Sequence, residues 1–391
     1  MQSQYPLFQG NPKQEGGERG NRLLHLLDFY IGVPLVFLLS IFRDRKKRPQ
    51  DSQIRKIGIL QTAAIGDTLL MSSPLRDLRL QFPDAEITIF HGPSNQSALP
   101  LFRGEFKTQV LRIKNPFYSA QLINQHGPFD LWIDFGPWPR LNALLCFFVK
   151  AYYKVGFQSA GQFRHYGYDL AVEHSHLRHE IENQRALIRA FAPNLPSVGP
   201  LTVVASEQKE RFVVFHMFPG GSRPHQKEWP TEYWLELLAA VIRQGYRVAF
   251  TGAPCDLCKT EALLAFWANY PGNPSPQDPT QQIDNLVGKK NLLETAQLLA
   301  RAQAVVSVNT GILHLAALVG ANLVGLHGPT SAKRWGPVNT NSVPIQSPRP
   351  CSPCLHLGSD YACPLNSCMQ ELSPESVLSA LQTFLSPSVT V

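Results

Sequence analysis

The sequence has no apolar run that would cross a membrane with ease. A spanning helix needs about 20 consecutive apolar residues, whereas the apolar stretch near the N-terminus extends only over residues 29–42. Asp28 precedes this stretch, and Gly32 and Pro34 weaken its helical pattern. It also starts too late, and lacks the small-residue cleavage site, for a secretory signal peptide. A membrane-spanning helix and a secretion signal are therefore both disfavoured.

Two common binding signatures are missing as well. A nucleic-acid-binding domain carries a basic face with interleaved aromatic residues, and the folded part of this sequence has no such stripe. The Walker A pattern, G-x-x-x-x-G-K-[ST], does not occur. The net charge of +7 arises largely within residues 1–50, which hold eight Lys and Arg against four Asp and Glu. We therefore expect no nucleic-acid partner and no P-loop.

The N-terminal region instead predicts contact with a membrane surface. Residues 1–22 are polar and rich in Gly and Gln, which indicates disorder. Residues 23–50 join an apolar segment to the basic sequence RDRKKR. A helix lying in the inner leaflet, held by the basic cluster against anionic lipid, fits this pattern. A helix packed on the protein's own surface and a spanning helix are the alternatives. We expect a peripheral or monotopic protein on the cytoplasmic side of the inner membrane.

The rest of the chain predicts two α/β domains, which its 391 residues can accommodate. Strands and helices alternate over residues 52–200 and again over 208–372, a pattern typical of parallel sheets covered on both faces. Single helices are predicted over 68–82 and 140–153, with a short strand after the second. Residues 373–391 hold a closing helix with Ser373 as its N-cap. The predicted fold is two Rossmann-like doubly wound domains facing a central cleft, where ligands usually bind, plus the N-terminal hydrophobic helix.

Two strand-to-helix junctions carry charged side chains. In QTAAIGDTLLMSSPL, Asp67 falls in the first helical turn, where it could complement the helix dipole or act as a general base facing the cleft. In PGGSRPHQK, the glycines together with Ser222, Arg223 and Lys227 could form a phosphate cradle. The alternative for the second junction is a surface loop with incidental charge.

A third junction, VNTGILHLAALVG, places small residues between a strand and a helix. The backbone N–H groups from Thr310 onward would be unsatisfied donors at the helix start, and Gly311 would allow close approach of an anion. His314 could orient the loop, reach a phosphate oxygen, or be a hydrogen-bonded structural residue. Residues 328–330 follow the next strand in the same way. Two such donor sets suit a diphosphate better than a single anion.

Six stretches in collinear order resemble glycosyltransferase family 9, the ADP-heptose:lipopolysaccharide heptosyltransferases and their relatives. They are AIGDTLLMSSPLRDLR, PGGSRPHQKEWPTEYW, VAFTGAP, NLVGKKNLLETAQLLARA, VNTGILHLAALVG and GLHGPTSAKRWGP. The resemblance begins near Lys56 and leaves out the residues before 52. It implies a GT-B fold and a nucleotide-diphosphate-sugar donor, with ADP-heptose as one candidate, held mainly by the C-terminal domain. It also implies inversion at the anomeric carbon with no catalytic metal and no required cofactor.

The resemblance assigns roles residue by residue. Asp67 matches the family's proposed catalytic base, which would take the proton from the attacking acceptor hydroxyl. The positions that match donor-phosphate contacts are Ser222, Arg223, Lys227, Thr310, Gly311 and His314. Gly252 and Asp256 fall loosely where the family contacts the nucleoside.

One position departs from the family pattern. The family usually has Asp where this chain has Asn309. If that Asp holds sugar hydroxyls, Asn can still hold them, with an altered sugar preference. If its charge stabilises the developing oxocarbenium ion, the rate of this enzyme should be lower.

Four cysteines near the C-terminus form a possible metal set. Thiols at this spacing could close a tetrahedral zinc site, could pair as disulfides, or could stay reduced and pack a loop. They are Cys351, Cys354, Cys363 and Cys368. Because similar stretches recur in the family's relatives without a catalytic metal, any zinc here would be structural.

The function expected from these observations is that of a membrane-associated, inverting glycosyltransferase. It would move a sugar, heptose among the candidates, from a nucleotide-diphosphate sugar to a lipopolysaccharide-like, lipid-linked or other envelope-glycan acceptor. A GT-B-type sugar-nucleotide epimerase is one alternative. A non-catalytic nucleotide-sugar-binding or scaffold protein is the other, and Asn309 is the feature that motivates it.

Overall fold

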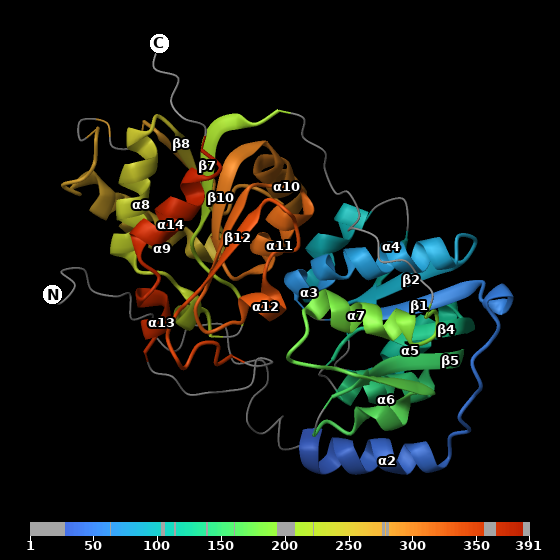
Figure 1. Cartoon of the computed structure of the whole chain (residues 1–391). Coiled ribbons are helices and arrows are strands. Elements are labelled where there is room, and N and C mark those ends of the chain that lie inside the picture. The colour runs from blue at the N-terminus through green and yellow to red at the C-terminus, as the bar shows by residue number, and fades with distance from the viewer. Residues whose placement is uncertain are drawn as a thin grey trace. The chain divides into compact units, whose positions relative to one another are not determined.

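The computed structural model describes most of the chain in two compact units, one spanning Gly20–Leu201 and the other containing Thr202–Val391 (Figure 1). Each unit is built on a six-stranded sheet in which all paired strands are parallel. The described residues are 28–62, 64–102, 106–112, 115–137, 140–159, 161–193, 208–221, 223–275, 278, 281–355 and 365–385.

The sheet of the N-terminal unit has the strand order β3-β2-β1-β4-β5-β6. Its strands are β1 Lys56–Gln61, β2 Glu86–His91, β3 Lys107–Val110, β4 Phe129–Asp134, β5 Ala151–Gln158 and β6 Leu170–Glu173. The chain adds strands on one side of β1 and then crosses to β4 on the other side. The strand order therefore reverses between β1 and β4, which is where open α/β sheets usually bind ligands.

Helices cover both faces of this sheet. They are α3 Ile65–Leu70, α4 Ser72–Gln81, α5 Pro116–His126, α6 Arg140–Phe148 and α7 Glu180–Arg189, with 3-10 segments η2 Asp51–Gln53, η3 Pro93–Phe102 and η4 Arg164–Gly167. Neighbouring strand residues point to opposite faces, so Ile59 packs with α4 and α7 whereas Leu60 packs with α5 and α6. Gly58 leaves room for the Trp132 ring, which lies 2.4 Å from the place where a Cβ would be.

Two predicted helices in this unit were wrong in detail. The predicted helix 68–82 is broken at Met71 into α3 and α4. Pro74 explains the break, because it has no N–H to donate to the carbonyl of Leu70. The predicted helix 140–153 ends at Phe148, and its last residues belong to β5, where Ala151 pairs with Phe129 of β4. Ladder pairing, which is a non-local interaction, decides the conformation there.

The C-terminal unit repeats the arrangement, with strand order β12-β11-β10-β7-β8-β9 and a reversal between β7 and β10. Its strands are β7 Glu210–His216, β8 Arg247–Thr251, β9 Ile283–Asn285, β10 Ala302–Val308, β11 Leu323–His327 and β12 Ser342–Gln346. Its helices are α8 Thr231–Arg243, α9 Leu257–Ala268, α10 Leu292–Arg301, α11 Gly311–Leu318, α12 Ala332–Trp335, α13 Ser367–Gln370 and α14 Pro374–Gln382, with η5 Pro224–Lys227 and η6 Pro254–Asp256.

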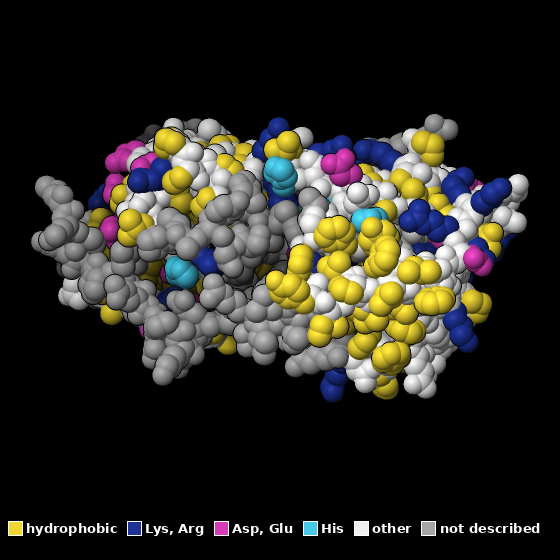
Figure 2. All heavy atoms as spheres, turned by 90° about the horizontal axis from the view of Figure 1, so that it is seen from below, with side chains coloured by type: hydrophobic (Ala, Val, Ile, Leu, Met, Phe, Trp, Pro, Cys, Tyr) yellow, Lys and Arg dark blue, Asp and Glu magenta, His cyan; other side chains and the backbone are white. Residues whose placement is uncertain are grey.

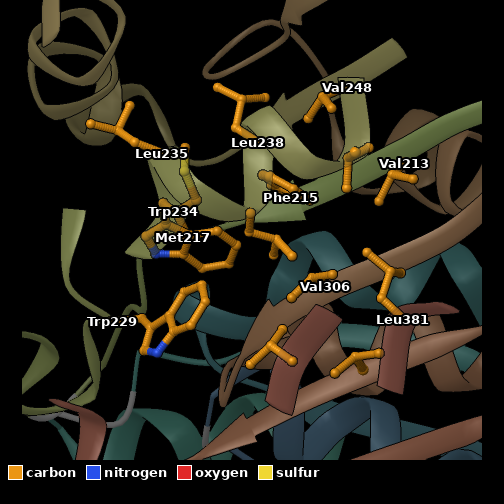
Figure 3. Close-up of a cluster of buried hydrophobic side chains, with 14 of the residues drawn as sticks. Val213, Phe215, Met217, Trp229, Trp234, Leu235, Leu238, Val248, Val306 and Leu381 are labelled. Carbon is orange, nitrogen blue, oxygen red and sulfur yellow. The ribbon is translucent and has the colours of Figure 1, made fainter. Parts of the chain in front are cut away.

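The closing helix α14 belongs to the core of this unit. Ser373 caps it by accepting a hydrogen bond from Ser376 N at 3.3 Å, which confirms the predicted N-cap. Leu381 packs in one buried cluster with Phe215 of β7 and Trp234 of α8, and Figure 3 shows side chains of this cluster gathered together. The helices α8, α9 and α14 thus cover one sheet face.

The N-terminal hydrophobic segment forms a π-helical turn, η1 Asp28–Gly32, followed by α2 Val33–Ile41. Residues 1–27 lie outside the described part of the chain. Helix α2 packs against α6 and η4, with Val36 fully buried and the Phe37 ring 5.4 Å from the Tyr166 ring. Within the described residues, no helix has the length and apolar character needed to span a bilayer.

Asp169 ties the end of this segment to the sheet. Its side chain is 1% exposed and forms an ion pair with Arg43 at 2.7 Å. Its carboxylate also accepts hydrogen bonds from Lys46 N at 2.9 Å and Lys154 N at 2.8 Å. One buried carboxylate thereby joins β5 to the chain that follows α2.

We predict that Asp169→Asn loosens this attachment. The amide removes the charge that pairs with Arg43, and its NH₂ group would face a backbone N–H that now donates to the carboxylate. Trypsin should cleave within the basic residues 45–48 about 10-fold faster than in the unaltered chain, as followed by mass spectrometry. Asp284→Asn is the control, because Asp284 pairs with Arg247 on the surface and its loss should leave the cleavage rate unchanged. Equal cleavage rates in both variants would contradict the attachment.

Candidate functional site

Four loops leave the same edge of the C-terminal sheet. The strands β11, β10, β7 and β8 are neighbours in that order. Their last residues are in register, with Val308 opposite Leu326, Ser307 opposite His216, and His216 opposite Thr251. The loops after these strands therefore emerge side by side at the carboxyl edge, on both sides of the strand-order reversal. Nearly all the predicted donor contacts lie in these loops.

The loop after β7 has an unusual backbone. Gly221 has φ +80° and Arg223 has φ +46°, which is the left-handed region that a side chain other than glycine rarely adopts. Lys227, at the end of η5, is 9% exposed and its Nζ donates to the carbonyl of Gly220 at 2.8 Å. The lysine thus lies against its own glycine loop. Ser222 lies outside the described residues.

The loop after β10 begins α11 as predicted. Thr310 is the N-cap, and its Oγ1 accepts a hydrogen bond from Ile312 N at 3.0 Å. Of the donors at this helix start, Ile312 N–H is thus engaged by the cap itself. His314 is buried one turn inside the helix, with its ring 6.4 Å from the Trp335 ring. The helix N-terminus begins directly at Gly311 and opens at the carboxyl edge.

Asn309 contacts two groups from neighbouring loops. Its Nδ2 lies 3.5 Å from His327 Nδ1 and donates to the Trp335 carbonyl at 3.4 Å. A carboxylate at this position could not donate to that carbonyl, so an amide suits the local geometry better. Trp335 is further held by the Arg334 guanidinium, 4.8 Å from the ring centre.

The loop after β11 is held by the C-terminal cysteine segment. Leu355 N donates to Pro329 O at 2.7 Å, and Ser352 Oγ donates to Gly328 O at 2.6 Å. The Thr330 hydroxyl beside them is buried and has no hydrogen-bond partner within the described part of the chain. The segment carrying the cysteines therefore supports a loop of the candidate site.

The predicted zinc site cannot be assembled from what the structure describes. Cys351 is exposed, Cys354 is half-buried, Cys368 is buried, and Cys363 lies outside the described residues. Across the described ranges, no group of three or more His, Cys, Asp and Glu side chains could hold a metal ion. The four-thiol zinc site therefore stays a prediction.

The loop after β8 contains the two weak nucleoside candidates. Asp256 accepts a hydrogen bond from Ala253 N at 2.8 Å, and burial raises the pKa of its carboxyl group. At Gly252, an added Cβ would lie 3.0 Å from Asp256 Oδ2. These residues form a compact turn next to the β7 loop.

His216 ends β7 directly below these loops. It is 6% exposed, and its Nδ1 lies 3.1 Å from Thr251 Oγ1. Burial lowers its pKa from 6.5 to about 4. The imidazole is therefore neutral at physiological pH and adds no charge beneath the loops.

Asp67 lies at the corresponding edge of the other unit, in the first turn of α3 after β1. Asn95 of η3 fixes the loop that carries it, since its Nδ2 donates to Gln61 O at 2.8 Å and to Thr68 Oγ1 at 2.7 Å. Gln184 of α7 donates to the Asp67 carbonyl at 3.2 Å. The backbone of Asp67 is thus held from two other elements while its half-buried side chain sits at the strand-order reversal.

A buried polar network supports the neighbouring strand end. Asp134, at the end of β4, accepts hydrogen bonds from Arg164 Nη2 at 2.5 Å, Tyr168 OH at 2.6 Å and Asn142 Nδ2 at 3.1 Å. Burial raises the pKa of the Asp134 carboxyl group, and the Arg164 guanidinium opposes that rise. Because its members are paired inside the protein, this network holds the β4–α6 loop rather than offering a reactive group.

The family model for glycosyltransferase family 9 (heptosyltransferase) matches residues 140–363, more than half of the chain. The chain belongs to this family. The match includes all four loops of the C-terminal edge, whereas the loop of Asp67 precedes it.

Family 9 relatives match over most of their length. Lipooligosaccharide heptosyltransferase 2 of Haemophilus influenzae is 24% identical over 326 residues, covering 74% of this chain and 88% of the relative. Lipopolysaccharide heptosyltransferase 2 of Salmonella typhimurium is 26% identical over 365 residues, covering 85% of this chain and 99% of the relative. This chain is a heptosyltransferase-family glycosyltransferase.

Solved family 9 structures share the fold. E. coli ADP-heptose lps heptosyltransferase II superposes with a TM-score of 0.67 at 21% identity, covering 84% of this chain and 98% of that one. An E. coli heptosyltransferase solved with ADP gives a TM-score of 0.64 at 18% identity, covering 84% and 100%. The two parallel six-stranded units are therefore a GT-B-like fold, which confirms the predicted fold class.

Sequence reasoning missed several residues of the candidate site. Asn95 follows β2 in a stretch without any recognised motif, and only the fold brings it to the loop of Asp67. His327 and Trp335 lie within the quoted stretch GLHGPTSAKRWGP, but their contact with Asn309 arises from strand pairing. An aromatic residue in the loop after a predicted strand was the signal that the sequence offered for Trp335.

His216 should make the stability of this family 9 enzyme depend on pH. The unfolded chain takes up a proton below pH 6.5, whereas folded His216 stays neutral down to about pH 4. Its contribution is therefore complete above pH 6.5 and is lost as the pH falls to about 4, at a cost of about 3 kcal/mol. The free energy of unfolding is measured by urea denaturation followed by tryptophan fluorescence. Between pH 6.5 and pH 4 it should fall by about 3 kcal/mol less in His216→Asn than in the unaltered chain. An unchanged pH dependence would contradict a neutral His216.

Proposed function

We propose that this chain transfers heptose from ADP-heptose to a lipopolysaccharide-type acceptor at the cytoplasmic face of the inner membrane, with inversion at the anomeric carbon. The carrying observation is the family 9 match across the four loops of the C-terminal edge. The relatives named above are lipooligosaccharide and lipopolysaccharide heptosyltransferases, and solved structures of this fold contain ADP and ADP-2-deoxy-2-fluoro heptose.

The donor diphosphate would bind at the strand-order reversal of the C-terminal sheet. The start of α11 offers backbone N–H groups at Thr310 and Gly311, and helix N-termini favour anions. The Lys227 ammonium lies in the adjacent loop, where it could exchange the Gly220 carbonyl for a phosphate oxygen. The buried Thr330 hydroxyl supplies a further donor from the next loop. These groups would stabilise the negative charge that grows on the leaving diphosphate.

The acceptor hydroxyl would be activated from the N-terminal unit. Asp67 would take its proton while the acceptor oxygen forms a bond to the anomeric carbon and the bond to the diphosphate breaks. Asn95 acts through the backbone that carries Asp67, so it is a positioning residue.

Asn309 bears on the choice of sugar. Its amide donates to the Trp335 carbonyl, which leaves its carbonyl oxygen available to accept a hydrogen bond from a sugar hydroxyl. In this proposal the neutral amide supports binding and contributes no charge to the transition state.

Asp67→Asn should lower the rate of heptose transfer by about 10²- to 10⁴-fold, because the amide cannot accept the acceptor proton. Transfer is measured with ADP-heptose and membrane extract as the source of acceptor, and donor affinity by calorimetry on the same preparation. Affinity for ADP-heptose should stay within about 3-fold of the unaltered chain.

Asp84→Asn is the matched control, because Asp84 is 82% exposed and pairs only loosely with Arg55. Both rate and affinity should be unaffected. Full activity in Asp67→Asn would exclude Asp67 as the base. Donor binding without transfer by the unaltered chain would indicate a binding protein, and sugar interconversion without acceptor would indicate an epimerase.

Lys227→Met should weaken ADP binding by about 10- to 100-fold, because it removes a cation from the diphosphate site while keeping the aliphatic stem. The same substitution should weaken adenosine binding much less, because adenosine has no phosphate for Lys227 to contact. Calorimetry with ADP and adenosine measures both.

Lys209→Met is the matched control for this experiment. Lys209 also donates to a backbone carbonyl, that of Ala300 at 2.7 Å, but it precedes β7 at the opposite edge of the same sheet. Its loss should leave ADP affinity unchanged. Equal effects of the two substitutions on ADP affinity would argue against a phosphate site at the carboxyl edge.

A further inference from the structure

The outer face of the N-terminal helix is apolar along its whole length. Ile31, Leu35, Leu38 and Phe42 are 57%, 41%, 53% and 88% exposed. Their spacing of four, three and four residues places them in one stripe along a helix. We call these four residues the outer stripe. Side chains of this kind are seldom left exposed together on a soluble surface.

The opposite face of the same helix is fixed to the N-terminal unit. Gly32 and Val36 are buried, and Arg43 continues that face to reach Asp169. The Arg140 guanidinium lies 5.6 Å from the ring centre of Phe29 in the preceding turn. Because both ends of the segment are held, the outer stripe is presented in one orientation.

More apolar side chains widen the stripe into a patch. Phe29, Tyr30, Phe37 and Ile41 are 47%, 70%, 48% and 61% exposed. Figure 2, which views the molecule from below, shows hydrophobic side chains gathered on the face where α2 lies, with Lys and Arg at the margin of the patch. Aromatic rings beside aliphatic ones suit the boundary between lipid headgroups and acyl chains.

Basic residues follow the patch directly. Arg45, Lys46 and Lys47 are exposed, and only Asp44 offsets them within this run. They lie outside any helix or strand just beyond Phe42, while the Lys46 backbone is fixed by Asp169. A short row of cations therefore borders the apolar patch at the C-terminal end of α2.

We propose that η1 and α2 form a monotopic docking surface that inserts the outer stripe into an anionic lipid bilayer, with Arg45, Lys46 and Lys47 on the lipid phosphates. The described part of this segment is too short to span a bilayer, but it suffices to reach the acyl boundary. The cations favour lipid over a second copy of this chain. A two-fold interface pairs each patch with itself, so it would bury the stripe without giving the cations a counter-charge.

The proposal deepens the proposed function, and it rests on that function only for the identity of the acceptor. The docking surface is carried by the same unit as Asp67, so binding of this unit to the bilayer would keep the proposed base in the protein fraction that meets a lipid-linked acceptor. Binding to vesicles requires neither donor nor acceptor, so it can be measured without any transfer reaction.

The experiment is cosedimentation of the full chain with phosphatidylcholine vesicles, with and without about one third phosphatidylglycerol. The double variant Leu35→Asp/Leu38→Asp should lose binding to the anionic vesicles by about 10-fold or more. Leu80→Asp is the matched control, because Leu80 is also 53% exposed and lies on α4, over the other sheet face. Its binding should equal that of the unaltered chain.

The basic row is tested separately. The triple variant R45Q/K46Q/K47Q should lose the preference for anionic over neutral vesicles, as should the unaltered chain in about 0.5 M salt. Thermal unfolding of both the stripe and the basic-row variants, followed by circular dichroism, should match that of the unaltered chain, which shows that the N-terminal unit carrying these substitutions is folded. If the unaltered chain bound vesicles but did not bind ADP, the proposed function would be contradicted and the docking surface would stand.

Three results would overturn the docking surface. One is that the unaltered chain fails to bind anionic vesicles. Another is that light scattering shows a dimer that Leu35→Asp/Leu38→Asp converts to a monomer, which would assign the patch to a second copy. The last is vesicle binding that arises only after residues 1–27 are deleted, which would show that the chain covers its own stripe.

Discussion

The constraint on which this structure depends is the parallel pairing of β7 with β10 at the centre of the C-terminal sheet. Parallel strands end at the same edge, and the chain reverses its strand order between these two. The loops on either side must therefore diverge, which leaves the start of α11 uncovered by a crossover connection. Backbone N–H groups, Lys227 and small residues therefore lie in neighbouring loops at this edge, although the sequence contains no Walker A pattern.

The N-terminal unit has the same kind of strand-order reversal, with different side chains beside it. Its reversal lies between β1 and β4, and the groups there are carboxylates rather than donors. Asp134 is enclosed by Arg164, Tyr168 and Asn142 and serves the fold. Asp67 belongs to a short helix whose backbone is held by Asn95 and Gln184. The Asp134 carboxylate is thus enclosed by its hydrogen-bond partners. The Asp67 side chain, in contrast, is half-buried at the carboxyl edge of the sheet.

The attachment of α2 shows that hydropathy alone does not determine which face of an apolar helix packs against the protein. Its sequence is apolar on all sides, so periodicity cannot tell the packed face from the exposed one. The structure separates them through Val36, which is buried, and through the ion pair of Arg43 with Asp169, a residue more than one hundred positions away. Hydropathy disfavoured a spanning helix, and no helix within the described residues is long and apolar enough to cross a bilayer, but hydropathy could not assign a face.

Local patterns in the sequence were enough to predict the alternation of strands and helices, the two-domain fold class, the family, and the N-cap at Ser373. Tertiary structure decided what depends on distant partners. The start of β5 follows pairing with β4, and the role of Asn95 follows its position beside β1. The amide of Asn309 meets the Trp335 carbonyl only because β10 and β11 end together. Such contacts join residues far apart in the chain, so no local pattern encodes them.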